Sequence, residues 1–161
     1  MHKHILRAFR LNQKLAELLV SDLTAAQMTQ QPHGLINHPA WTLGHLVVTG
    51  NNICKTLGLE SSLPEGWGDK FKAGVTPDPD PAQNPSKEEL LEAFRTCHKQ
   101  LSEALAGISE EELAKKHPNE GTRKYFPTIG DFVVYLMTAH EGDHLGQVAA
   151  WRRAMGLGPA M

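Results

Sequence analysis

The stretch IGDFVVYLMTAHEGDHLGQVAAWRR, residues 129–153, decides the fold of this chain. Apolar side chains recur in it every three to four residues, which is the period of an amphipathic α-helix. Thr128 stands where an N-cap is expected, and Gly156 follows the last turn as a stop signal. At about 100° per residue, His140 and His144 fall on the apolar face. The sequence therefore predicts a helix that directs two imidazoles into the protein core.

Three further segments, residues 3–20, 39–57 and 87–106, show the same helical period. No segment shows sustained alternation of apolar and polar residues, so we expect no sheet. The sequence predicts an all-α, four-helix bundle that forms one domain over residues 1–161. The stretch 60–85 is rich in proline and glycine, and it becomes a long connection between the second and third helices that crosses one end of the bundle. Its expected role is either a lid over a pocket or a mobile tether.

Composition excludes several classes of protein. The 161 residues carry 16 Lys and Arg against 18 Asp and Glu, a net charge of −2 with no basic cluster, so we expect no nucleic-acid partner. No run reaches the roughly 18 apolar residues that span a bilayer. Charges throughout residues 1–20 argue against a signal peptide, and Cys54 and Cys97 are too few for a disulfide framework. We expect a soluble, cytoplasmic protein that acts on a small-molecule substrate.

His45 is the third histidine with a helical context. It lies on the second predicted helix, and Trp41, Thr49 and Asn52 share its face, while Cys54 points to the opposite side. A histidine that faces an inward pair on another helix makes a three-nitrogen site with an open position for water or substrate. Thr49 and Asn52 then become candidate pocket-lining residues, or they merely face a neighbouring helix.

Two buried histidines at i and i+4 have two explanations. Either each imidazole is a core residue satisfied by hydrogen bonds, or the pair shares a metal ion. The spacing of His140 and His144 favours the metal. For the remaining histidines we expect surface or turn roles: His2, His4, His33, His38, His98 and His117. Glu141 lies about 100° off the histidine face and is expected to be exposed to solvent. The alternative is that Glu141 or Asp143 acts as an acid or base, or supports the metal ligands.

The string His140-Glu141-Gly142-Asp143-His144 also matches the zinc protease pattern HExxH. Such enzymes take a third ligand from downstream, but residues 145–161 contain no His, Asp, Glu or Cys. The protease interpretation is therefore disfavoured.

A stripe of small residues covers the back of the same helix. Thr138, Gly142, Gly146 and Ala149 lie roughly opposite the histidines and would allow another helix to approach closely. Because the inner face is already occupied by the bundle, we expect that partner to come from a second subunit. A homodimer is the resulting hypothesis.

Three segments together resemble the DinB/YfiT-like family of metal-binding four-helix bundles. They are LTAAQMTQQP at 23–32, NHPAWTLGHLV at 37–47 and HEGDHLGQV at 140–148. The resemblance implies a dimer and a divalent metal held by His45, His140 and His144. It also implies a pocket role for Gln147. Family members of known activity include thiol-dependent transferases and isomerases that use bacillithiol or mycothiol.

The function expected from these features is that of a metal-dependent enzyme. A divalent transition metal, zinc or nickel, would bind a thiolate or water at its open position, and a low-molecular-weight thiol would serve as cosubstrate. The reaction would be that of a thiol-dependent S-transferase or isomerase. The alternatives are a non-catalytic metal- or ligand-binding module and, less favoured, a metal-dependent hydrolase. A fourth ligand from Asp143, the 60–85 loop or His4 would favour the non-catalytic module.

Overall fold

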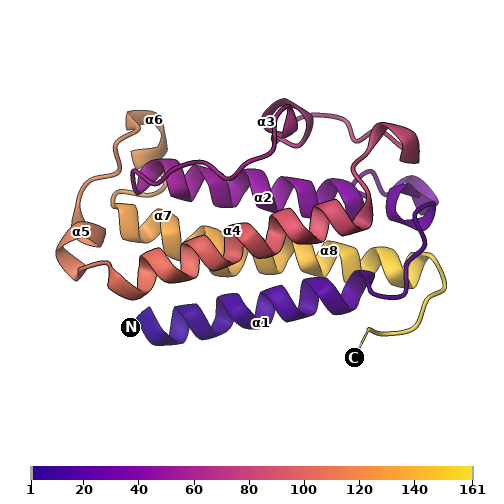
Figure 1. Ribbon diagram of the computed structural model, residues 1–161, viewed down its shortest axis with the longest axis horizontal. Helices are drawn as coiled ribbons and strands as arrows, with labels where there is room; N and C mark the ends of the chain where they lie inside the picture. Colours follow the sequence, from indigo (N-terminus) through magenta and orange to yellow (C-terminus); the bar gives the residue numbers. More distant parts are fainter. Residues whose placement is uncertain (1, 161) are drawn as a thin grey trace.

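The chain forms an all-helical bundle in the computed structural model, which describes residues 2–160, with the side chain of His2 outside that description. Four long helices lie side by side, as predicted, and each contacts two of the others (Figure 1). They are α1 (His2–Val20), α2 (Pro39–Thr56), α4 (Lys87–Gly107) and a fourth built from α7 (Ile129–Tyr135), the π turn η4 (Leu136–His140) and α8 (Glu141–Ala154). Short helices fill the connections: η1 (Gln27–Thr29), η2 (Pro32–Gly34), α3 (Trp67–Lys70), η3 (Pro81–Gln83), α5 (Glu110–Ala114) and α6 (Glu120–Arg123). The described residues contain no strand.

The helix ends lie where capping residues place them. Ser86 and Glu89 form both halves of a capping box at the start of α4, and Thr128 and Asp131 do the same for α7. Gly58 follows α2 with a φ of 70°, a left-handed conformation in which glycine avoids a side-chain penalty. Local chemistry therefore accounts for these three helix boundaries.

The fourth helix departs from the regular helix that the sequence predicts. A π turn at 136–140 adds one residue to the helix just before the second half begins. Tyr135 and His140 would lie about 140° apart on a regular helix, but a π turn aligns residues five apart. Their ring centroids are 6.1 Å apart. The side chains of α7, before the π turn, therefore point in other directions relative to His140 than a constant 100° per residue predicts.

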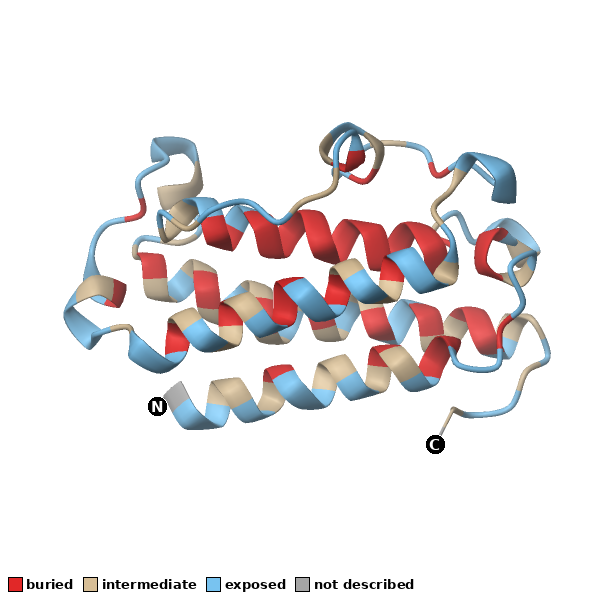
Figure 2. Cartoon of the chain, viewed as in Figure 1, coloured by how far each residue is buried: buried red, intermediate tan, exposed pale blue. Residues whose placement is uncertain are grey.

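The long connection between α2 and α4 runs along α2 (Figure 1), and the expectation that it crosses one end of the bundle was wrong. Trp67 and Phe71 are buried, at 8% and 0% exposure, and the structure adds the short helix α3 where the sequence predicted only loop. The Phe71 ring lies over Gly44, and His38 Nε2 donates to Asp78 O at 2.9 Å. With this cover, α2 is buried along most of its length (Figure 2). No helix in residues 2–160 is both long and apolar enough to cross a membrane.

The contact between Gly44 and Phe71 yields a prediction of stability. Gly→Ala inside a helix normally stabilises it by about 1 kcal/mol. At Gly44 a Cβ would lie 2.5 Å from Phe71 Cγ, so Gly44→Ala should instead destabilise the fold by roughly 1–3 kcal/mol. Urea unfolding monitored by circular dichroism measures the difference.

The matched control is Gly107→Ala at the end of α4, where an added Cβ has no atom within 4 Å. This variant should be as stable as the parent or slightly more stable. Equal effects of the two substitutions would contradict the packing role assigned to Phe71.

Candidate metal centre

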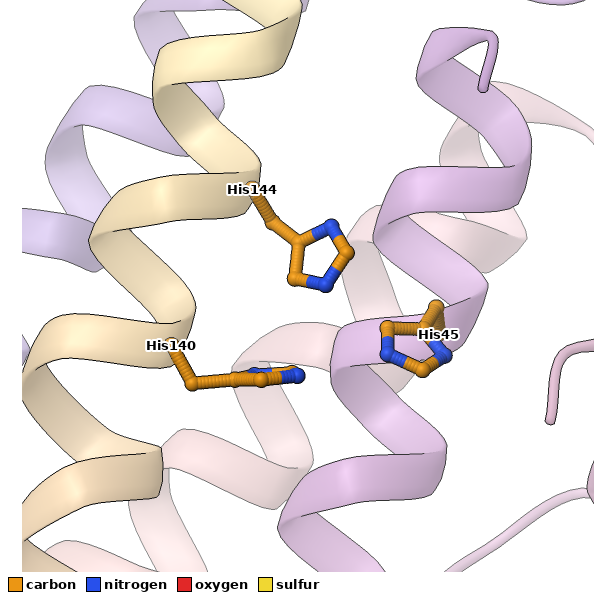
Figure 3. A group of neighbouring side chains, drawn as sticks. All are labelled: His45, His140 and His144. Carbon is orange, nitrogen blue, oxygen red and sulfur yellow. The ribbon is translucent and has the colours of Figure 1, made fainter. Parts of the chain in front are cut away.

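Three histidines meet between α2 and the fourth helix. His45 comes from α2, His140 from the end of the π turn and His144 from α8, and their rings face one another (Figure 3). One ring nitrogen from each lies within 4.8 Å of the other two, so a single ion could reach all three. The structure confirms that the residues chosen from the helical faces form one cluster.

His45 is held by the long connection. Its Nδ1 donates to the backbone carbonyl of Phe71 at 2.8 Å, which leaves the Nε2 lone pair for an ion. The Trp41 ring stacks on the imidazole with centroids 4.7 Å apart and planes 9° apart. Proteins commonly orient a metal-binding histidine through a hydrogen bond that its other ring N–H donates. The connection therefore orients one ligand of the candidate site.

His140 and His144 are partly exposed, but their Nδ1 atoms are buried and have no hydrogen-bond partner. The core-histidine explanation requires such partners, because a buried polar atom without one costs free energy. These unpaired nitrogens beside a third imidazole fit a metal centre better than a set of satisfied core histidines.

The electrostatic setting keeps the three rings neutral. Burial lowers the pKa of His45, His140 and His144, and nearby imidazoles lower the pKa of His140 and His144 further. The pKa of His144 falls to about 4. A neutral imidazole offers the lone pair that a metal requires, so the site is ready for an ion at neutral pH.

The cluster offers three candidate ligands among the described residues, so an ion held by it would keep a coordination position for water or a small ligand. Asp143 and His4 are exposed and do not belong to the group of candidate ligands found in the described residues. Three protein ligands with an open position are typical of catalytic metal sites, whereas structural sites usually have four. The arrangement can hold an ion and still admit a small ligand.

The predicted pocket residues differ in their surroundings. Thr49 is buried and donates its hydroxyl to the His45 carbonyl at 2.8 Å, while Asn52 is exposed. Gln147 accepts from Asn37 Nδ2 at 3.1 Å, and its side chain opposes the lowering of the His144 pKa. Gln147 therefore lies beside the histidine cluster, and ligand binding by all three residues stays a prediction.

Two expectations for polar residues were wrong. Glu141 and His98 are buried, at 3% and 2% exposure, and His98 Nε2 donates to Glu141 Oε1 at 2.6 Å. Burial raises the pKa of Glu141. Charged neighbours on α4 suggested a surface role for His98, but it continues the apolar stripe of Phe94, Cys97 and Leu101. That stripe was the available signal in the sequence.

Comparison with known proteins supports the fold and the family. The sequence model described as the DinB superfamily matches residues 8–148. A crystal structure of a conserved protein from Enterococcus faecalis is similar, with a TM-score of 0.79, 19% identity, and coverage of 97% of this chain and 98% of that one. At this identity the likeness shows a shared fold alone. No curated protein matches the chain.

The lowered histidine pKa values predict how stability depends on pH. The unfolded chain protonates His144 near pH 6.5, whereas the folded chain does so near pH 4. The unfolded state therefore binds more protons between these values, and stability falls as the pH falls through this window. Because His144 is partly exposed, solvent screening reduces the loss to roughly 1–3 kcal/mol.

Urea unfolding of metal-free protein from about pH 7.5 to about pH 4.5 measures this dependence. His144→Gln should show a shallower decline than the parent. Parallel profiles of the two proteins would contradict the assignment to His144.

Proposed function

The chain belongs to the DinB superfamily, and from that membership and the three-histidine cluster we propose that it is a metal-dependent enzyme. His45, His140 and His144 would hold one divalent transition ion, zinc or nickel. The observation that carries the proposal is the set of three neutral imidazoles, two of them partly exposed, with no fourth candidate ligand among the described residues. An ion held there would keep an open coordination position.

The reaction class follows from that open position. A divalent ion there lowers the pKa of a bound thiol or water and so supplies a nucleophile at neutral pH. We propose a thiol-dependent S-transferase or isomerase, with a low-molecular-weight thiol as cosubstrate and a small electrophilic molecule as substrate. A cytoplasmic location belongs to the same proposal, because thiols remain reduced there.

Residues around the cluster offer contacts for such ligands. Trp41 Nε1 is buried without a hydrogen-bond partner, and its ring stacks on His45 at 4.7 Å between centroids, with the His144 centroid 6.3 Å away. Tyr135 lies beside His140 and is 39% exposed. An unpaired indole donor and an exposed phenol at the edge of the cluster suit a polar substrate.

The competing functions have weaker support. A non-catalytic metal-binding module would normally close its site with a fourth ligand, and the cluster contains three. In an HExxH hydrolase the glutamate acts as general base. Here the Glu141 carboxylate is bonded to His98 and Asn12, on helices α4 and α1, which argues against that role.

Metal content gives the first test. We expect one equivalent of a transition metal per chain, measured by elemental analysis of protein purified without a polyhistidine tag. His45→Ala and His144→Ala should lose the metal, because a catalytic site needs all three nitrogens. Both variants should remain folded. His33→Ala, which changes an exposed histidine outside the cluster, is the control and should retain it.

The loaded parent is then assayed for consumption of a thiol in the presence of an electrophile, with His144→Ala as the blank. A folded parent that neither contains metal nor can be reloaded contradicts the proposal. Full metal content with no reaction of any thiol would favour the binding module.

We further propose a homodimer formed through the back of the fourth helix. Gly142 and Gly146 have no atom within 4 Å of an added Cβ, and a groove beside α1 is lined by Thr138 and Ala139. Light scattering at micromolar concentration should give twice the monomer mass, and Gly146→Arg should give the monomer mass. A monomeric parent would contradict the dimer.

A further inference from the structure

A buried polar cluster lies behind the candidate metal centre. Glu141 directly follows His140 in the chain. Its hydrogen-bond partners, however, lie on α1 and α4, whereas His45 lies on α2. Its Oε1 accepts from His98 Nε2 of α4 at 2.6 Å, and its Oε2 accepts from Asn12 Nδ2 of α1 at 3.1 Å. The side chains of Glu141 and His98 are only 3–4% exposed. The cluster therefore joins three helices inside the bundle.

The same cluster reaches the backbone of the π turn. The amide of Glu141 donates to Thr138 O, three residues back, and not to Met137 O as in a regular α-helix. Met137 O accepts a hydrogen bond from Asn12 Nδ2 at 3.4 Å. Asn12 thus donates to two acceptors. One is the Met137 carbonyl, which has lost its usual helical partner, and the other is the Glu141 carboxylate.

His98 is rigidly placed for this contact. It stacks on Phe9 with ring centroids 3.7 Å apart and planes 9° apart, and Phe94 lies against it at 4.3 Å. Two aromatic contacts restrict the imidazole to one orientation, so the position of Glu141 is restrained through it.

The π turn matters because it sets the phase of the helix. One extra residue rotates α8 by about 100° relative to α7. With the turn in place, Val133 of α7 faces the core while His140 and His144 face His45. On a regular helix Val133 and His140 would lie about 20° apart, whereas the extra residue turns them toward different sides of the core.

We propose that Asn12, His98 and Glu141 form a clamp that fixes the π turn and thereby positions His140 for the metal ion. All three are positioning residues that act through the backbone of the fourth helix. The inference rests on the proposed metal site. It assigns a role to the buried HExxH glutamate other than that of a general base.

The test compares the clamp with another polar link between the α1 region and α8. Asn12→Ala removes both bonds of Asn12. Glu141→Gln keeps the size of the side chain but replaces one acceptor oxygen by a donor. The control is Asp22→Ala, which removes the partner of buried Arg152, two helical turns beyond His144.

Two readouts separate positioning from general destabilisation. The first is the Co(II) affinity of each variant, with the visible absorption of bound Co(II) as a report on ligand geometry. Asn12→Ala and Glu141→Gln should bind Co(II) at least about tenfold more weakly than the parent and alter the spectrum, because partners that orient a ligand typically contribute 10- to 100-fold in affinity. Asp22→Ala should bind as the parent does.

The second readout is amide hydrogen exchange across residues 136–141 in metal-free protein. It should be faster in Asn12→Ala than in Asp22→Ala. Equal losses of Co(II) affinity in the clamp variants and the control would overturn the clamp. A parent that takes up no Co(II) would contradict the proposed function. Hydrogen exchange alone would then test the clamp. Faster exchange in Asn12→Ala than in Asp22→Ala would support the clamp, and equal exchange would overturn it.

Discussion

Three uncharged imidazoles packed together in a partly dry interior are the constraint on which the rest of this structure depends. Burial lowers the pKa of each ring, and His140 and His144 each retain a buried nitrogen without a partner. Burial also disfavours the proton that could satisfy such an atom, because it lowers the pKa of the ring. The surrounding helices hold the three rings together. A divalent ion would bind the lone pairs of these neutral imidazoles and is the ligand that fits the cluster best.

The surrounding fold supplies that force from two sides. On one side the connection between α2 and α4 covers α2, places Phe71 over Gly44 and presents the Phe71 carbonyl to His45. This link makes the long connection part of the site, although it contributes no candidate ligand. On the other side, the π turn presents His140, and bonds from α1 and α4 hold the residues that flank it. Each ligand-bearing helix is thus restrained by a segment distant in the sequence.

The sequence sufficed for features that depend on local chemistry. The capping residues Ser86 and Thr128 marked the helix starts, and the i, i+4 spacing of His140 and His144 identified their shared face. The errors came from tertiary packing. The π turn broke the assumption of a constant 100° per residue for the part of the helix before His140. Glu141 follows the turn, and its exposure was predicted wrongly because α1 and α4 cover that side of the helix. The packing of Phe71 likewise depends on a glycine in another helix, and no local pattern in the connection reveals it.

The buried glutamate behind His140 shows why polar groups persist in such a core. An ion pair or hydrogen-bonded carboxyl in a protein interior often contributes less stability than apolar side chains of the same volume. An apolar replacement of Glu141 would still fill the space, but it would leave the π turn free to relax to a regular helix. Relaxation would rotate His140 and His144 relative to α7. The proposed metal site would then lose its geometry, while the buried apolar area would stay the same. The directional bonds of Glu141 thus specify geometry, which apolar contacts do only weakly. The proposed metal centre, with three nitrogens within 4.8 Å of one another, would depend on that geometry.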